Sequence, residues 1–122
     1  MEISKIFTFE SAHFLPFFPE GHKCRRLHGH SFRLQTYIKG ELQKGILMDY
    51  GEIKRVVKPF VDMLDHRLIN EVGQEINSPL LQNPTSENLA LWFAQVLTPI
   101  LPQLSAIRIH ETCTTECFLR LK

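Results

Sequence analysis

Residues 28–39 read HGHSFRLQTYIK, and this stretch decides the fold class. Its even positions carry two histidines and then Phe, Leu, Thr and Ile, whereas most of its odd positions are polar. Successive side chains of a strand point to opposite faces of a sheet, so this alternation predicts a strand with one buried face. The turn that ends the strand is expected over residues 40–45, which begin and end with glycine.

Three more stretches show alternation, and they are predicted to be strands over residues 2–13, 105–111 and 117–121. With two helices between the second and third strands, the order is β-β-α-α-β-β. This order favours an α+β fold, in which a four-stranded antiparallel sheet carries both helices on one face. Four strands leave two sheet edges, and such edges invite pairing with another chain, which favours a homo-oligomer.

The first helix is expected to begin at Asp49, because a glutamate follows three residues later and an apolar stripe comes after it. Pro59 should kink this helix, since its ring clashes with the carbonyl four residues earlier. Thr85 or Ser86 can cap the second helix. Glycine, asparagine and proline punctuate residues 65–84, so this connection is predicted to be irregular.

The 122 residues suit one domain, spanning residues 1–122. Lys and Arg total 14 and Asp and Glu total 13, and this near-balance argues against a nucleic-acid binder. The N-terminus lacks the features of a signal peptide, and no apolar run is long enough to span a membrane, so we expect a cytoplasmic protein without membrane partners. Three cysteines cannot all pair, which favours thiols or metal ligands.

The histidines are the strongest chemical signal in the chain. His28 and His30 lie two apart, so they share one face of their strand, and His13 ends the first strand on its apolar face. If the two strands pair, the three rings can converge. Three imidazoles and one open position describe a catalytic Zn²⁺ site. The alternative is that these are surface or core histidines without a metal.

Cys24 lies in a basic loop, four residues before His28. Neighbouring cations lower the pKa of a thiol, so Cys24 could act as a base or nucleophile beside the metal. It could equally be an inert loop thiol, or a fourth zinc ligand that makes the site structural. Taken alone, the residues favour these last two interpretations.

Two further sites carry carboxylates. Asp65 and His66 follow the first helix, and because adjacent side chains do not easily bond each other, we expect two separate groups. The alternative is that this dipeptide is only a feature of the helix C-terminus. Glu111 ends the third strand on its apolar face, where a buried carboxylate needs paired donors. The two parallel N–H donors of a guanine or pterin edge would satisfy it. Exposure at the strand end is the alternative.

Five blocks occur in the order found in the 6-pyruvoyl-tetrahydropterin synthase family, and they cover nearly the whole chain. They are FESAH (9–13), CRRLHGH (24–30), LDHRLIN (64–70), PTSENLA (84–90) and ETCT (111–114). The chain therefore resembles this family, and the loop before His28 is similar to that of its bacterial 6-carboxytetrahydropterin synthase (QueD) branch. The resemblance implies the tunnelling fold, in which three subunits close a barrel and two trimers stack as a hexamer, with active sites where subunits meet.

The resemblance also implies roles for individual residues. Zinc would be bound by three histidines, namely His13, His28 and His30. The proton-transfer group would consist of the base Cys24 together with Asp65 and His66. The pterin ring would be anchored by Glu111, with Thr85 and Glu87 nearby.

The implied reaction converts 7,8-dihydroneopterin triphosphate and water to 6-carboxytetrahydropterin, acetaldehyde and triphosphate, on the route to queuosine and other 7-deazaguanines. The nearest alternative is 6-pyruvoyl-tetrahydropterin synthase activity, which expels triphosphate but keeps the side chain. Some relatives carry a glutamate in place of the loop cysteine and cleave the side chain differently, an activity that Cys24 disfavours. Alternatives of other classes are a non-catalytic zinc- or pterin-binding protein and a metal-independent cysteine hydrolase.

Overall fold

The longest elements are two paired strands, β1 (Glu2–His13) and β2 (His28–Lys39). The computed structural model describes residues 1–122, and in it these strands pair antiparallel in unbroken register from Glu2 opposite Lys39 to His13 opposite His28. β3 (Leu104–His110) pairs with β2, and β4 (Glu116–Arg120) pairs with β3, both antiparallel. The strand order is β1-β2-β3-β4, so the predicted four-stranded antiparallel sheet is confirmed.

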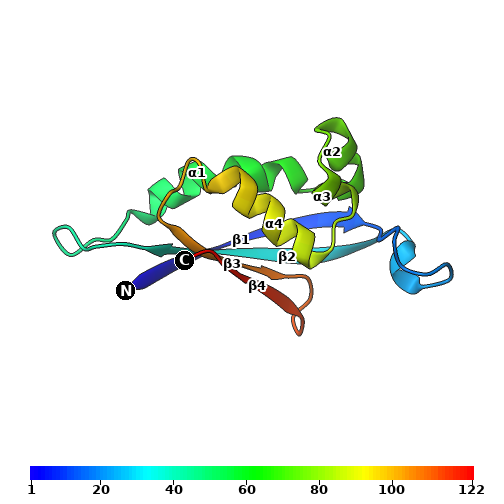
Figure 1. Cartoon of the computed structure of the whole chain (residues 1–122), viewed down its shortest axis with the longest axis horizontal. Helices are drawn as coiled ribbons and strands as arrows, with labels where there is room; N and C mark the ends of the chain where they lie inside the picture. The colour runs from blue at the N-terminus through cyan, green and yellow to red at the C-terminus, as the bar shows by residue number, and fades with distance from the viewer.

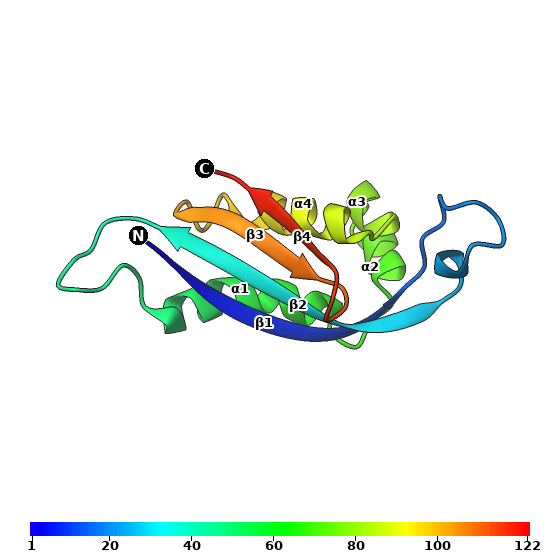
Figure 2. The same ribbon diagram turned by 90° about the horizontal axis from the view of Figure 1, so that it is seen from below.

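Two helices, α1 (Tyr50–Leu64) and α4 (Ser86–Leu97), cover one face of the sheet (Figure 1). The view from below in Figure 2 shows the other face without a covering layer. The predicted caps are present, because Asp49 accepts from the amide of Gly51 and Thr85 accepts from the amide of Asn88. α1 continues through Pro59 without a break in the helix.

The connection over residues 65–84 was predicted to be irregular, and this was wrong. It contains two short helices, α2 (Ile69–Glu75) and α3 (Pro79–Gln82). Ser78 caps α3, and Pro79 stands at its first turn, where a missing amide costs nothing, so this proline begins a helix instead of breaking one. A Cβ on Gly73 would lie 2.6 Å from the amide nitrogen of Gln82, so the glycine allows α2 to pack closely against the end of α3.

The core lies between the sheet and the helices and consists of 21 buried apolar residues. Phe9 of β1 and Phe32 of β2 stack there, with ring centroids 5.1 Å apart. The same face of these strands continues beyond the core to His13 and His30, so the packed apolar layer directly adjoins the histidines. No helix is both long enough and apolar enough to cross a membrane.

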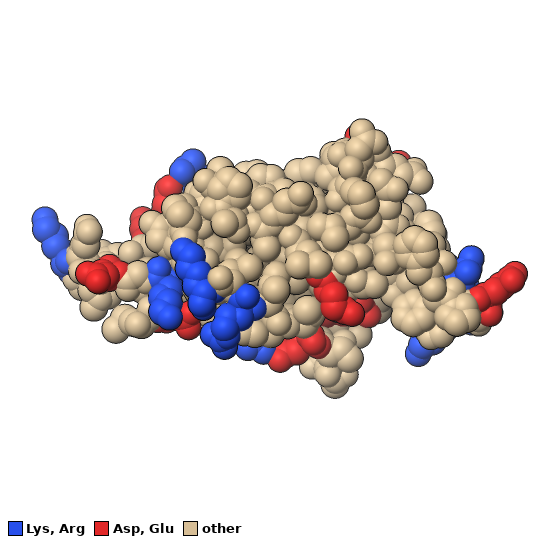
Figure 3. Space-filling model, in the orientation of Figure 1, with Lys and Arg blue, Asp and Glu red and all other residues tan.

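The uncovered face of the sheet mixes charged side chains with a few apolar and aromatic ones, such as Ile6 and Phe118. Arg108 and Arg120 flank the ring of Phe118 there, with guanidinium carbons 4.8 and 5.2 Å from its centroid. In Figure 3, basic side chains cluster on the sheet side of the molecule, below the helices and toward the chain termini. Such a surface can face water without a second covering layer.

The segment after α1 covers part of the outer edge of β1. The amide of Glu10 donates to Oδ1 of Asp65 at 2.9 Å, and the carbonyl of Glu10 accepts from the amide of His66 at 2.6 Å. Two residues later, the amide of Ala12 donates to the carbonyl of Arg67 at 3.0 Å. These bonds hold Asp65 and His66 beside the second half of β1.

Candidate metal centre and active site

Three imidazoles gather where β1 ends and β2 begins. One ring nitrogen from each of His13, His28 and His30 lies within 4.8 Å of the other two. Register explains the grouping, because His13 stands opposite His28, and His30 shares the inward face of β2. His13 is fully buried, and the other two are half-buried. The predicted convergence of the three rings is confirmed.

The remaining ring nitrogens are held by backbone carbonyls. Nδ1 of His13 lies 2.9 Å from the carbonyl of Pro84, and Nδ1 of His28 lies 2.6 Å from the carbonyl of Arg26. A carbonyl only accepts, so both Nδ1 atoms donate, and in a neutral ring Nε2 then carries a lone pair. These two Nε2 atoms face each other at 3.0 Å. Two facing lone pairs repel unless a cation lies beside them, so the pair is arranged for a metal ion.

The surroundings of two of the rings, those of His13 and His30, favour the neutral form. Several causes together lower the pKa of His13 to about 4: burial is the largest, the bond to Pro84 opposes the shift, and the neighbouring His28 and His30 add to it. Burial also lowers the pKa of His30, and this is partly opposed by Glu111. Metal ions bind the neutral form of imidazole, so burial prepares these ligands for a metal near pH 7.

The donor set and its spacing fit zinc. Nitrogen ligands of a tetrahedral Zn²⁺ lie about 3.3 Å from one another, between the 3.0 Å of the facing pair and the 4.8 Å limit of the cluster. Nε2 of His30 is buried and has no hydrogen-bond partner, which is costly unless something else binds there. No cysteine or carboxylate belongs to the cluster, so one tetrahedral position is left open.

Cys24 lies in a short 3₁₀ turn, η1 (Lys23–Arg25), and is half-buried. Its amide donates to Nδ1 of His22 at 3.0 Å, and its carbonyl accepts from the amide of Leu15 at 2.8 Å. The second bond ties the loop to the chain just after His13. The backbone of Cys24 is thus held close in space to the end of β1, but its sulfur is not among the grouped ligand atoms.

Asp65 and His66 do contact each other, so the expectation of two separate groups was wrong. Nδ1 of His66 lies 3.0 Å from Oδ2 of Asp65. The backbone explains the contact: His66 has a φ of 59°, in the left-handed region, and this conformation lets its side chain fold back on its neighbour. The hydrogen bond from the amide of Glu10 lowers the pKa of Asp65, and the bond with His66 lowers it further.

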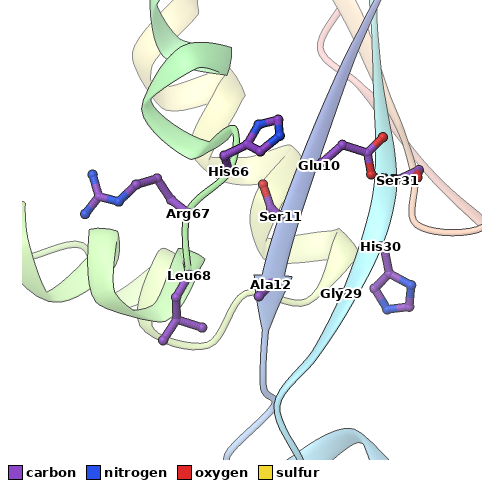
Figure 4. A pocket seen from close by; sticks show the side chains of 9 residues that line it. All are labelled: Glu10, Ser11, Ala12, Gly29, His30, Ser31, His66, Arg67 and Leu68. Atoms are coloured by element: carbon purple, nitrogen blue, oxygen red, sulfur yellow. Dashed lines mark hydrogen bonds between the residues drawn. The ribbon is translucent and has the colours of Figure 1, made fainter.

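The Asp65–His66 pair does not join the metal cluster within one chain. The side chain of His66 is 78% exposed. In Figure 4 its ring lies beside β1, whereas the ring of His30 lies on the far side of β2. His66 and His30 nevertheless line the same open cavity of about 500 Å³, which passes across the end of β1 and the start of β2.

The three predicted substrate residues lie in different places. Glu111 follows β3 directly, and its Oε1 is 3.6 Å from Nε2 of His30, so this carboxylate adjoins the metal cluster. Thr85 is the N-cap of α4, and Glu87 lies in the first turn, where it accepts from the hydroxyl of Ser86. The structure does not group Thr85 or Glu87 with the imidazoles, although the carbonyl of Pro84 next to them binds His13.

Sequence reasoning missed the groups that orient the ligands. The carbonyls of Arg26 and Pro84 are backbone groups, which every residue has, so the sequence does not indicate which ones bind the histidines. Asn70 is buried, and its side chain bonds the backbone next to His13. It stands at the end of the LDHRLIN block, and a polar residue on the inner side of that segment was the only available signal.

Comparison with known proteins supports the resemblance. The sequence pattern of the family described as 6-pyruvoyl tetrahydropterin synthase matches residues 2–122. A 6-carboxy-5,6,7,8-tetrahydropterin synthase from Synechocystis is 41% identical, covering 93% of this chain and 88% of that protein. A dihydroneopterin monophosphate aldolase from Pyrococcus furiosus is 36% identical, covering 78% and 73% respectively.

The fold is also shared with solved structures. That of Caenorhabditis elegans 6-pyruvoyl tetrahydropterin synthase superposes with a TM-score of 0.86 at 20% identity, covering 100% of this chain and 96% of that one. The expected tunnelling fold is therefore confirmed for the single chain, and the assembly of subunits stays a prediction. With the family pattern matched over residues 2–122, this chain belongs to the 6-pyruvoyl tetrahydropterin synthase family.

Proposed function

We propose that this chain is a zinc-dependent 6-carboxytetrahydropterin synthase of queuosine and 7-deazaguanine biosynthesis, active in the cytoplasm. It converts 7,8-dihydroneopterin triphosphate and water to 6-carboxytetrahydropterin, acetaldehyde and triphosphate. The observation that carries the proposal is the facing pair of Nε2 atoms of His13 and His28. The Nδ1 atom of each ring is hydrogen-bonded to a backbone carbonyl, which fixes the ring's orientation. The 41% identity to a relative named for this activity supports the choice of reaction.

His13, His28 and His30 are the residues that would hold Zn²⁺, with one position open to substrate. When bound, the ion supplies Lewis-acid polarisation of a substrate oxygen. The redox change is internal to the substrate, so no nicotinamide or flavin is required.

The chain's own groups bind substrate and move protons. The thiolate of Cys24 accepts a proton from a side-chain carbon of the substrate, and His66, oriented by Asp65 at 3.0 Å, carries a proton between the substrate and solvent. Glu111 accepts two hydrogen bonds from the guanidine-like edge of the pterin. Thr85 and Glu87 are assigned to the wall around the ring.

The assembly that we propose is a homohexamer of two stacked trimers, with each active site built where subunits meet. Two observations support it. The Asp65–His66 pair lies apart from the metal cluster of its own chain, so it can serve the cluster of a neighbour. In addition, β1 and β4 are edge strands, which can pair with other copies. Light scattering during gel filtration tests the proposal and should give the mass of six chains.

Product analysis tests the reaction itself. Zinc-loaded protein is incubated with 7,8-dihydroneopterin triphosphate, and acetaldehyde and the pterin product are identified by mass spectrometry. Acetaldehyde together with the carboxy product supports the proposal. An intact pyruvoyl product would assign 6-pyruvoyl-tetrahydropterin synthase activity, and no consumption would contradict both. Turnover that survives complete chelation would favour the cysteine hydrolase.

Replacement of the loop thiol separates catalysis from structure. Cys24→Ala should reduce kcat at least about 100-fold while the zinc content stays at one ion per chain, because the sulfur lies outside the ligand cluster. Cys113→Ala removes an exposed thiol and is the matched control, with activity retained. Loss of zinc from Cys24→Ala would instead support a structural, non-catalytic site.

A further inference from the structure

Asn70 is a buried amide at the second position of α2, and it is 4% exposed. All of its hydrogen bonds go to the backbone. Its Oδ1 accepts from the amide of Phe14 at 3.1 Å, and its Nδ2 donates to the carbonyl of Phe14 at 2.8 Å and to the carbonyl of Gln82 at 3.3 Å. Donor and acceptor atoms of this side chain are therefore both satisfied in the interior.

The two segments that Asn70 joins are the two that set the position of the His13 ring. Phe14 follows His13 directly, so the double bond to its backbone fixes the end of β1. Gln82 lies two residues before Pro84, whose carbonyl accepts from Nδ1 of His13 at 2.9 Å. One side chain thus connects the backbone that carries the ligand to the loop that orients it.

The anchor of this connection is rigid. One turn after Asn70, Gly73 approaches α3 so closely that a Cβ would lie 2.6 Å from backbone atoms of Leu81 and Gln82. The carbonyl of Gly73 also accepts from the amide of Ser78 at 2.8 Å. α2 is therefore packed directly against the residues that lead to Pro84.

We propose that Asn70 is a positioning residue for the metal centre, and that it sets metal affinity by holding His13 and the Pro84 carbonyl in register. The proposal rests on the metal site assigned above. An amide is required because it is both donor and acceptor: a carboxylate of the same shape places an oxygen against the carbonyls of Phe14 and Gln82. Outer partners of metal-binding histidines commonly change metal affinity 10- to 100-fold.

The test uses metal binding and needs no substrate. Zinc affinity is measured by chelator competition for the wild-type chain and for Asn70→Asp, and apoprotein is titrated with Co²⁺ to record its visible absorption. Asn70→Asp should bind zinc about 10- to 100-fold more weakly and shift the Co²⁺ bands, because the ligand geometry changes. A wild-type affinity and an unchanged spectrum would overturn the proposal.

A matched control separates positioning from general loss of stability. Ser105 is also fully buried and hydrogen-bonded, but at the opposite end of the sheet. Ser105→Ala should keep the wild-type zinc affinity and spectrum, and an equal weakening in both variants would count against a special role for Asn70. Asn70→Ser is a smaller second variant, and failure of both Asn70 variants to fold would assign the residue to the fold alone.

These results are distinguishable from failure of the proposed reaction. The wild-type chain could bind zinc in an Asn70-dependent way and yet not consume the pterin triphosphate. That result would support the positioning role of Asn70 and contradict the proposed reaction. If the wild-type chain binds no divalent ion, both the positioning role and the proposed reaction are contradicted.

Discussion

The two ends of the β1–β2 pair bury polar groups in different ways. At the end near the chain termini, the hydroxyl of Ser105 is fully buried and lies 2.8 Å from Oε1 of Glu2 and 3.2 Å from the carbonyl of Tyr37. At the other end, Nε2 of His30 is buried without a hydrogen-bond partner, and the carboxylate of Glu111 stays 3.6 Å away. A folded chain rarely leaves such an atom unsatisfied, so the contrast marks the histidine end as the place where a group from outside the chain completes the structure.

Removal of a ligand should break this contrast most strongly. His28→Ala takes away one of the three imidazoles, and we expect zinc affinity to fall at least about 1,000-fold, because two nitrogens do not form a tetrahedral site. Chelator competition measures the change. Thr36→Val alters a buried position in the middle of β2 and should keep the zinc affinity of the wild type. A similar loss of affinity in this variant would mean that any disturbance of the sheet weakens zinc binding.

Acid should weaken the histidine end of the metal-free protein. The pKa of His13 is lowered to about 4 in the folded state, against about 6.5 unfolded, so the unfolded state binds more protons between these values. The contribution of His13 to stability is therefore complete above pH 6.5 and is lost as the pH falls toward 4, which amounts to about 3 kcal/mol. Urea unfolding of EDTA-treated protein across this range measures the slope.

The control for this pH effect is His13→Gln, which removes the more strongly shifted group and should reduce the slope between pH 6.5 and 4, while the lowered pKa of His30 leaves a smaller slope. Asp65 has a lowered pKa, so its stabilising effect is lost only at still lower pH and does not confuse the comparison. An unchanged slope in His13→Gln would contradict the assignment of the effect to this ring.

At the opposite end, the satisfied hydroxyl should matter for stability alone. Ser105→Ala removes hydrogen bonds to Glu2 and Tyr37 and is expected to lower the free energy of unfolding by about 1–2 kcal/mol. Urea denaturation at pH 7 measures this. Stability equal to that of the wild type would show that the two ends differ less than their hydrogen bonds indicate.

The smallest effect concerns Thr85, which lies beside the loop that orients His13. Loss of its cap to the amide of Asn88 in Thr85→Ala should destabilise the protein by about 1 kcal/mol, and Thr85→Ser should restore most of this. KM is measured alongside. If KM rises in Thr85→Ala and returns to the wild-type value in Thr85→Ser, Thr85 contacts the substrate in addition to capping the helix. An unchanged KM in Thr85→Ala would mean that Thr85 only caps the helix.

The sequence predicted the elements with strong periodicity. Alternation over β1 and β2 predicted their bounds correctly, since one face of each is buried over most of its length. The third and fourth strands were displaced by one residue, because short strands carry few alternating positions. α2 and α3 were missed, since helices of seven and four residues are too short for an apolar stripe to appear.

Within the candidate site, sequence predicted residue types better than geometry. The three histidines could be grouped in advance because two of them share a strand face and the third ends the neighbouring strand. The contact between Asp65 and His66 depends on a left-handed φ that a histidine rarely adopts, so nothing in the composition indicated it. The carbonyl partners of the rings depend on where loops pass, which is a property of the finished fold.

The segment that covers the outer edge of β1 also limits how copies of the chain can meet. Because residues 65–67 occupy the backbone of Glu10 and Ala12, an incoming strand can add only to the earlier part of β1. In the proposed assembly, strands from successive copies would then be offset lengthwise, and such a stagger is what a sheet needs in order to close on itself. The loop that holds His66 in place would therefore also set the register between the edge strands of neighbouring subunits.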